Sequence, residues 1–253
     1  MVINAIVRPP ASSYIHCISE HPLRAKISLE EAKRQHASFC RKLSEMGCKI
    51  HNLTPDGRYP DGCFVEDRCF AFKNLAVICP SSIEDRKGEG IEIRRVISGF
   101  KEVKEIVYPG VADGGDIIEI EGDIFARISK RTNLEGVKQL SNILGKQVAI
   151  LDIPQKILHL KSVTTNIGKE VILVREDISY IWKDTRYNII PVSKKEAIAA
   201  NCIAIGNQVM VPAGCQEAMK KIEQHGFSTI GVEITEFEKG DGSLTCLAVL
   251  FEA

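Results

Sequence analysis

The sequence lacks an excess of charge of either sign, because 33 Lys and Arg residues balance 33 Asp and Glu residues. It also lacks long runs of like charge, so nothing indicates a nucleic-acid or membrane-surface partner. No apolar run approaches the roughly 20 residues of a bilayer-spanning helix. The first residues, MVINAIVRPP, lack the basic start and long apolar core of a secretory signal. We therefore expect a cytoplasmic protein with no membrane partner.

Paired cysteine spacing is missing as well. The chain contains nine Cys residues, an odd number, and no Cys-x-x-Cys pair. This pattern argues against a disulfide framework, and no His stands at zinc-ligand spacing from a cysteine pair. We expect most of these cysteines to be small buried hydrophobic residues. The open question is whether one of them has a different environment and reacts.

A weak internal repeat is present, in which a helical pattern stops at a glycine and a strand pattern follows. The clear copies are residues 29–46 before Gly47, residues 134–144 before Gly145 and residues 215–225 before Gly226, with a fainter copy at Gly99. Pairs of strand patterns precede several of these helices. The spacing leaves room for a further unit near residues 165–195, where the helix pattern is weak.

The repeat predicts five strand–strand–helix–strand units. A generic α/β sandwich, in which the regular spacing is coincidence, is the alternative. No linker rich in Pro, Gly or Ser divides the chain, so we expect a single domain over residues 1–253.

An acidic segment, DGCFVED at residues 61–67, precedes the strand pattern CFAF. It contains Asp61, Glu66 and Asp67. Paired carboxylates suit a flat cation with several N–H donors, such as a guanidinium. Neighbouring residues of an extended chain point to opposite faces, so Glu66 and Asp67 can share a ligand only where the chain turns. The alternative is a solvated acidic turn.

Two further segments combine turn residues with charge. In Asp113-Gly114-Gly115-Asp116 a carboxylate at a tight turn could orient a catalytic histidine, although the turn alone would explain the glycines. SKRTN, at residues 129–133, places Arg131 at a strand-to-helix junction, where it could bind a carboxylate bidentately. The helix start nearby also favours an anion. The alternative here is a helix entry with exposed charges.

A histidine and a cysteine complete the set of candidates. His159 alternates with leucines in LHLKS, which places it on the opposite strand face from them. Cys246 follows the glycine-rich segment that begins at Gly240 and enters the last strand pattern, where a thiol can be both fixed and accessible. Cys, His and carboxylate together can attack an sp² carbon. Alone, a buried structural role would explain either residue.

The segments FVED, DGGD, SKRTN, LHLKS and DGSLTC, in this order, resemble the guanidino-modifying enzyme superfamily. Within it they are most similar to the dimethylarginine dimethylaminohydrolase family. The segments EEAKRQHASFC and NCI, at residues 30–40 and 201–203, add to the resemblance, which covers nearly the whole chain. It implies a five-bladed pseudosymmetric α/β propeller of ββαβ units, the pentein fold, in agreement with the repeat.

The resemblance also implies residue roles. Cys246 matches the nucleophile, His159 the general acid and base, and Asp113 the carboxylate that orients the histidine, a position that can be Glu in relatives. The residues that match substrate contacts are Glu66 and Asp67 at the guanidinium, Asp61, Asp241 and Gly240 around it, Arg86 and Arg131 at the α-carboxylate, and Leu23 in a lid.

The implied activity is hydrolysis of the guanidino C–N bond of a methylated arginine to citrulline and an amine, through a thiouronium on Cys246. No metal or organic cofactor is needed. Arginine deiminases, which release ammonia from free arginine, are the nearest alternative, but they usually carry a helical domain for which this chain has no room. Amidinotransferases would need an amine acceptor in place of water.

A non-catalytic protein like the ribosome anti-association factor shares the architecture and is the alternative from another class. The conjunction of Cys246, His159 and Asp113 argues against it. The sequence does not separate methylated from free arginine as the small-molecule partner, and it leaves open a homo-oligomer.

Overall fold

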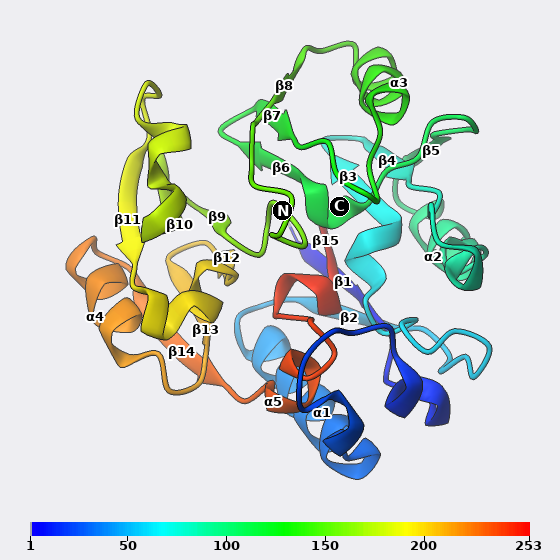
Figure 1. The fold of residues 1–253 in the computed structure, drawn as a ribbon, viewed down its shortest axis with the longest axis horizontal. Helices are drawn as coiled ribbons and strands as arrows, with labels where there is room; N and C mark the ends of the chain where they lie inside the picture. Colours follow the sequence, from blue (N-terminus) through cyan, green and yellow to red (C-terminus); the bar gives the residue numbers. More distant parts are fainter. Residues whose placement is uncertain (1) are drawn as a thin grey trace.

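The computed structural model describes residues 2–253 and arranges them as five three-stranded sheets around a common centre (Figure 1). Each sheet combines one antiparallel and one parallel strand pair that share the middle strand. A parallel pair needs a crossover connection, and this is where the helices lie. The predicted propeller of five α/β units is confirmed.

Four sheets follow one another along the chain, each with a helical segment in the crossover to its third strand. The first sheet has β3 (Cys69–Phe72), β4 (Leu75–Ile78) and β5 (Glu102–Glu105), with α2 (Gly90–Ile97) in its crossover. The second has β6 (Ile117–Ile120), β7 (Asp123–Ala126) and β8 (Val148–Ile150), with α3 (Leu134–Leu144) in its crossover. The third has β9 (Thr164–Gly168), β10 (Val171–Arg175) and β11 (Asn188–Val192), and the fourth has β12 (Ile203–Ile205), β13 (Gln208–Pro212) and β14 (Ser228–Val232), with α4 (Gln216–Gln224) in its crossover.

The fifth sheet joins the two ends of the chain. The last strand, β15 (Val249–Glu252), pairs antiparallel with β1 (Ile3–Val7), which pairs parallel with β2 (Lys49–Asn52). α1 (Leu29–Glu45) forms the crossover between β1 and β2, and the short α5 (Thr235–Glu238) precedes the last strand. The ring is therefore closed by hydrogen bonds between residues at opposite ends of the sequence.

The helix boundaries follow from local chemistry. Ser28 accepts a hydrogen bond from the Glu31 amide at the start of α1, and Asn133 accepts one from the Gly136 amide at the start of α3. α3 ends at Gly145, which has a positive φ of 58° that few other residues adopt. The terminal glycine is the signal that the repeat displayed in the sequence.

The unit predicted near residues 165–195 is present, but its crossover lacks the α-helix that the other units have. A 3-10 segment, Glu176–Trp182, takes the place of the α-helix between β10 and β11. Trp182 is fully buried and packs edge-on against Phe125. The segment is thus held by its buried aromatic residue, which explains why the sequence shows no helical periodicity there.

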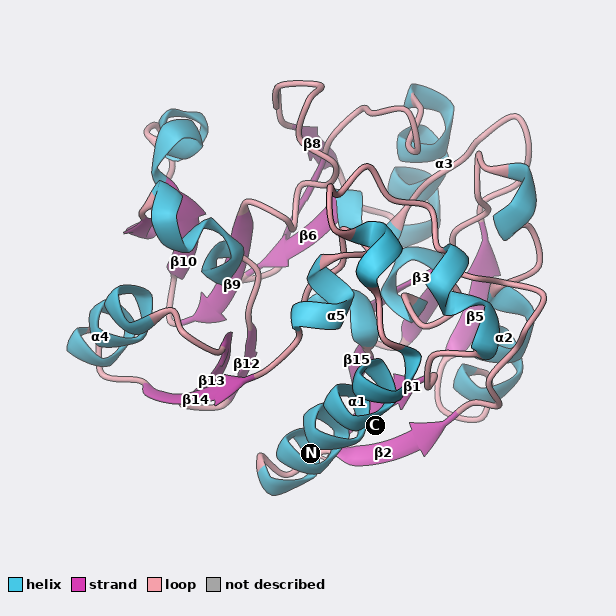
Figure 2. Cartoon of the chain, turned by 60° about the horizontal axis from the view of Figure 1, so that its bottom comes forward, coloured by secondary structure: helices cyan, strands magenta, loops and turns pink. Residues whose placement is uncertain are grey.

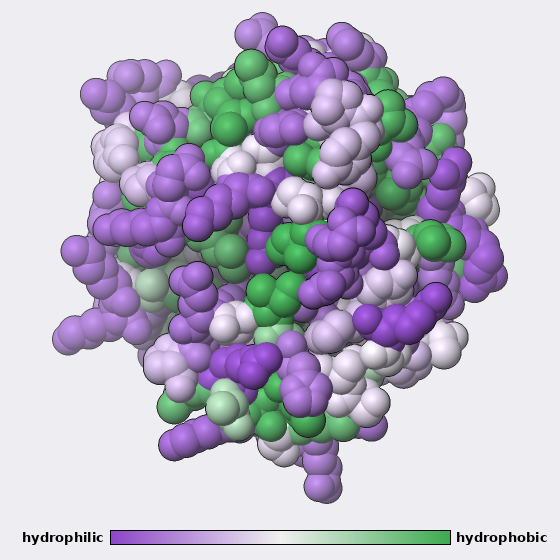
Figure 3. Space-filling view, turned by 45° about the vertical axis from the view of Figure 1, so that its right-hand side comes forward, coloured by the Kyte–Doolittle hydropathy of each residue, from purple (hydrophilic) through white to green (hydrophobic). Residues whose placement is uncertain are grey.

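The sheets lie toward the centre and the α-helices lie at the periphery (Figures 1 and 2). β3, β6, β9, β12 and β15 are the innermost strands, and several of them contact one another. Polar residues cover much of the face shown in Figure 3, with apolar groups between them. No helix within residues 2–253 is long and apolar enough to cross a bilayer.

Candidate active site

A small, tightly lined pocket lies where the segments that precede several inner strands converge. Most of the predicted site residues line it, although they are far apart in the sequence. The lining residues are Ile18, Asp61, Phe64, Asp67, Arg86, Arg131, Leu158, His159, Gly240, Asp241, Gly242 and Cys246. Cys246, His159 and acidic side chains thus border one cavity.

Cys246 lies in the 3-10 turn Thr245–Leu247, directly before β15, and is 8% exposed. Burial raises the pKa of its thiol well above the usual value, and the carboxylates of Asp67 and Glu66 raise it further. The side chain is therefore a neutral thiol at rest. It needs a positive charge in the pocket to become a nucleophilic thiolate.

His159 is 3% exposed, and its Nε2 lies 3.4 Å from Oδ1 of Asp113. Burial lowers the pKa of His159, but the carboxylates of Asp113, Asp67 and Asp116 more than offset burial, so the pKa lies above its usual value. The pKa of Asp113 is held well below its usual range, because the charges of His159 and Arg68 outweigh its own burial. The imidazole is thus arranged to carry a proton beside the pocket.

The two glycines of the DGGD segment are required by close contacts. A Cβ at Gly114 would lie 2.0 Å from the Glu66 carbonyl oxygen, and a Cβ at Gly115 would lie 2.9 Å from Cγ of His159. The segment therefore packs directly under both the acidic turn and the histidine ring. Asp113 reaches His159 because no side chain stands between them.

Three guanidinium groups surround the two buried carboxylates at the pocket floor. Arg86 is paired with Asp67 at 2.7 Å, and Arg68 is paired with Asp113 at 2.7 Å. Nη1 of Arg131 lies farther away, 3.7 Å from Asp113 and 3.8 Å from Asp67. Arg131 is also more open than Arg86, with 15% against 2% of its side chain exposed. It is the cation best placed to bind an incoming anion.

Asp67, Asp113 and His159 offer ligand atoms within 4.8 Å of one another, and they are the group in the described chain that could hold a metal ion. Arg68 and Arg86 already neutralise the two carboxylates with direct ion pairs. A divalent cation would be brought next to these guanidinium charges, so the donor set does not suit a metal.

Asp61 and Asp241 are engaged with the N-terminal segment. Asp61 accepts a hydrogen bond from the Ile18 amide at 3.1 Å, and Asp241 accepts one from the Glu20 amide at 2.9 Å. Ile18 therefore lines the pocket, whereas Leu23 is 43% exposed and lies outside the lining. The lid role of Leu23 stays a prediction, and Ile18 is a pocket residue that the sequence did not single out.

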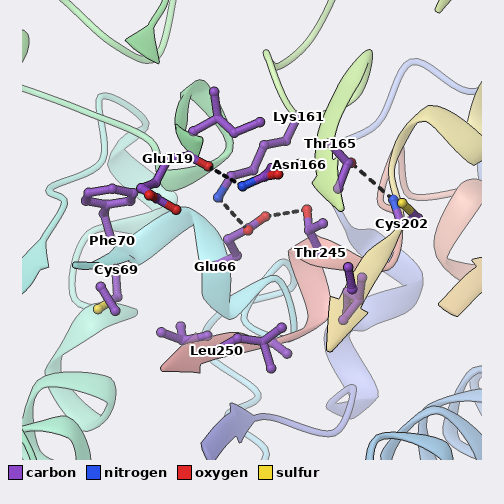
Figure 4. Close-up of a pocket in the computed structure, with 16 residues that line it drawn as sticks. Glu66, Cys69, Phe70, Glu119, Lys161, Thr165, Asn166, Cys202, Thr245 and Leu250 are labelled. Carbon is purple, nitrogen blue, oxygen red and sulfur yellow. Dashed lines mark hydrogen bonds and ion pairs between the residues drawn. The ribbon is translucent and has the colours of Figure 1, made fainter. Parts of the chain in front are cut away.

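The side chain of Glu66 points away from this pocket. Its carboxylate accepts hydrogen bonds from Lys161 Nζ at 2.7 Å and from the Thr245 hydroxyl at 2.6 Å, and it borders a second, larger hollow (Figure 4). Adjacent residues diverge in the 3-10 turn Val65–Arg68, so Asp67 faces the pocket and Glu66 does not. The expected contact of Glu66 with a guanidinium stays a prediction.

Sequence reasoning also missed Asp116, the last residue of the DGGD segment. Its carboxylate accepts hydrogen bonds from the hydroxyls of Ser129, at 2.6 Å, and Thr132, at 2.8 Å. A longer bond, 3.3 Å, comes from the Leu160 amide next to His159. Asp116 thereby links the loop of Arg131 to the segment of His159. The signal available in the sequence was the presence of Asp116 in the DGGD segment and of the hydroxyl residues Ser129 and Thr132 in the SKRTN segment.

Comparison with known families gives a match over most of the chain. Residues 16–251 match the model of the family described as N,N dimethylarginine dimethylhydrolase, eukaryotic. N(G),N(G)-dimethylarginine dimethylaminohydrolase of Pseudomonas aeruginosa is 31% identical over 255 residues, which cover 99% of this chain and 100% of that protein.

Solved structures agree with this match. A cysteine-to-serine variant of the P. aeruginosa enzyme in complex with citrulline has a TM-score of 0.93 and 31% identity, covering 99% of this chain and 100% of that one. The N-terminal domain of ArgZ, an arginine dihydrolase of cyanobacteria, has a TM-score of 0.87 at 18% identity, with 99% and 97% covered. This second likeness concerns the fold alone.

Proposed function

Because the chain belongs to the dimethylarginine dimethylaminohydrolase family, we propose that it hydrolyses the guanidino C–N bond of an Nω-methylated arginine to citrulline and methylamine or dimethylamine. The observation that carries the proposal is the pocket shared by Cys246, His159 and Asp67. The complex of a close structural neighbour with citrulline supports the same product here.

Substrate binding would activate the nucleophile. Asp67 and Asp61 line the pocket, and Oδ1 of Asp67, which has no hydrogen-bond partner in the described chain, can accept a hydrogen bond from a guanidinium. A cation bound beside Cys246 lowers the pKa of its thiol, because an opposite charge stabilises the thiolate. The thiol proton passes to solvent, and the cation, held between carboxylates, presents its central carbon to the sulfur.

Attack by the Cys246 thiolate forms a C–S bond and a tetrahedral adduct. His159, whose pKa is raised by Asp113 and its neighbours, gives a proton to the leaving amine as an imidazolium. The C–N bond then breaks, the amine departs, and a thiouronium remains on Cys246. This step uses His159 as a general acid, which typically contributes about 10²–10⁴-fold to the rate.

Hydrolysis returns the enzyme to its starting state. The neutral His159 removes a proton from water, which attacks the thiouronium carbon. The C–S bond breaks, the proton on the new oxygen passes to the sulfur, and citrulline leaves behind the neutral thiol of Cys246 and the imidazolium of His159. Every group that these steps require belongs to the chain, the substrate or water.

We expect the purified protein to form citrulline from dimethylarginine with a higher kcat/KM than from arginine. Both substrates are assayed side by side by citrulline colorimetry, with amine and ammonia measured separately. A preference for arginine with release of ammonia would support the arginine deiminase alternative instead. Absence of citrulline from both substrates would refute the proposal.

Arg131→Ala is expected to raise KM for dimethylarginine by about 10- to 100-fold, the range expected for loss of a hydrogen-bonded charge partner. The reason is that Arg131 is the open cation at the pocket and faces the expected position of the α-carboxylate. An analogue without that carboxylate, such as a methylated agmatine, should show little further loss.

Arg58→Ala provides the matched control for Arg131, because Arg58 is exposed and pairs only with Asp56 beside it. It should leave KM for both compounds unchanged. Equal losses for dimethylarginine and the agmatine analogue in the Arg131 variant would count against carboxylate recognition by this residue.

A further inference from the structure

Four residues behind the pocket form a closed cycle of hydrogen bonds, in which Lys161 takes part through both its side chain and its backbone carbonyl. We call this cycle the Glu66 ring: Glu66, Lys161, Asn201 and Thr245. Lys161 Nζ and the Thr245 hydroxyl donate to the two oxygens of Glu66 at 2.7 and 2.6 Å (Figure 4). Asn201 Nδ2 donates to the Lys161 carbonyl at 2.9 Å and to the Thr245 hydroxyl at 3.0 Å. Asn201 Oδ1 accepts from the Thr245 amide at 2.9 Å.

The side-chain hydrogen-bond donors and acceptors of Asn201 and Thr245 have partners within the ring. The Asn201 amide employs both its donors and its acceptor within the ring, and the Thr245 hydroxyl both donates and accepts. Asn201 and Glu66 are buried, with 2% and 8% of their surface exposed. Lys161 and Thr245 are partly buried, so displacement of the ring would leave the buried Asn201 and Glu66 without some of their partners, and the network resists it.

The members of the ring are close in sequence to the groups that line the pocket. Glu66 directly precedes Asp67, Thr245 directly precedes Cys246, and Lys161 follows His159 by two residues. Consecutive Cα atoms are about 3.8 Å apart, so a shift in the ring is transmitted to the neighbouring pocket residue. Glu66, Lys161 and Thr245 line the hollow in Figure 4, whereas Cys246 lines the pocket and not this hollow.

The propeller explains why these four residues meet. Glu66, Lys161, Asn201 and Thr245 each lie in the short segment that leads into an inner strand, namely β3, β9, β12 and β15. Asn201 belongs to a unit that contributes no residue to the lining of the pocket. The hydrogen bonds of Asn201 therefore connect two segments, the one that contains His159 and the one that contains Cys246.

We propose that Lys161, Asn201 and Thr245 are positioning residues for the reaction: together with Glu66 they fix Cys246, His159 and Asp67 relative to one another. This inference rests on the proposed function, because it concerns the geometry of attack. A displacement of about 1 Å between reacting groups can cost on the order of 100-fold in rate.

The test compares Thr245→Val, which keeps the shape and removes the hydroxyl, with Thr245→Ser, which keeps the hydroxyl. We expect Thr245→Val to lower kcat on the order of 100-fold, with KM changed by no more than about threefold, because Thr245 does not line the pocket. Thr245→Ser should restore most of the lost kcat.

Thr164→Val is the matched control. Thr164 is fully buried and its hydroxyl accepts a hydrogen bond from Trp182, so the variant loses a buried hydroxyl that is not part of the ring. It should lower the unfolding midpoint as Thr245→Val does and leave kcat within about twofold of the parent, because the lost bond is shared with Trp182 and not with a ring residue. Equal loss of kcat in both valine variants, or failure of Thr245→Ser to restore it, would overturn the proposal.

A second measurement needs neither turnover nor the threonine variants. Asn201→Leu keeps the approximate size of the side chain and removes its hydrogen bonds to Lys161 and Thr245 without changing the charge near Cys246. A loosened ring should no longer hold Cys246 in its buried position. We expect iodoacetamide to alkylate Cys246 several-fold faster in this variant, while the other buried cysteines, mapped by peptide mass spectrometry, remain protected. Unchanged labelling of Cys246, or faster labelling of every cysteine, would contradict the proposal. If the parent protein makes no citrulline, the proposed function fails, and this labelling still decides the role of the ring.

Discussion

Cys246→Ser is expected to abolish citrulline formation, with kcat lowered on the order of 10⁴-fold or more, the scale seen when a nucleophile is removed from other enzymes. The proposed reaction passes through a bond between the substrate carbon and this sulfur. A serine hydroxyl is far harder to ionise than a thiol, and a guanidinium bound beside Asp67 does not compensate for that difference. Citrulline colorimetry on the variant and the parent at equal concentration measures the loss.

The same substitution should leave substrate binding intact. Burial and the neighbouring carboxylates keep Cys246 as a neutral thiol in the free protein, so serine replaces it without a change of charge. Isothermal titration with dimethylarginine should therefore still detect binding to the variant. Loss of binding together with activity would point to a collapsed pocket rather than a missing nucleophile.

A matched control for this prediction is Cys40→Ser. Cys40 is only partly buried, lies in α1 and is far in sequence from the pocket residues. The Cys40 variant should keep normal turnover. In a separate experiment, the parent protein is quenched during turnover, and the peptide that contains Cys246 should then carry the covalent intermediate. Citrulline production by the Cys246 variant at the parental rate would exclude the proposed nucleophile.

Much of the fold could be predicted because the units repeat a local signal. The terminal glycine Gly145 marks a helix end in the sequence and in the structure alike. The crossover Glu176–Trp182 could not be predicted in this way. Its conformation depends on the burial of Trp182 against Phe125, a residue from another unit, and tertiary contacts of this kind leave no periodic pattern.

The sequence was enough to predict which segments form the site, but not in which direction the side chains of those segments point. Glu66 and Asp67 are adjacent acidic residues, and nothing local distinguishes them. The structure separates them, because Lys161 and Thr245 draw Glu66 to one side and Arg86 holds Asp67 on the other. Which way each carboxylate points depends on partners that the sequence places up to 179 residues away.

The partners of the buried charges explain why several polar residues outside the predicted set are present. Arg68 pairs with Asp113, and Glu89 pairs with Arg86. Removing one member of a buried ion pair typically costs about 3–5 kcal/mol, since the other charge is left uncompensated. Asp113 is held by Arg68 as well as by His159, so loss of the imidazole alone leaves this carboxylate with a partner. Substitution of His159 can therefore be tested without loss of the fold.

His159→Ala is expected to lower the turnover of dimethylarginine by about 10²–10⁴-fold, the range for loss of a general acid and base. An amine leaves readily only when protonated, and the variant has no donor at that position. His36→Ala is the control, because His36 is also buried, with 3% of its surface exposed, and burial lowers its pKa to about 4. It lies in α1, outside the pocket lining, and its loss should spare turnover.

The leaving group separates the acid role of His159 from its base role. In S-methyl-L-thiocitrulline a methylthio group takes the place of the leaving amine, and a thiolate departs without a proton. The His159 variant should therefore form the thiouronium on Cys246 and release about one methanethiol per protein, as expected for a burst of covalent intermediate. It should then stall, because the attack of water still needs the base. Intact-protein mass spectrometry would detect the accumulated adduct. Continuous formation of citrulline from this compound at the parental rate would show that His159 is not the base.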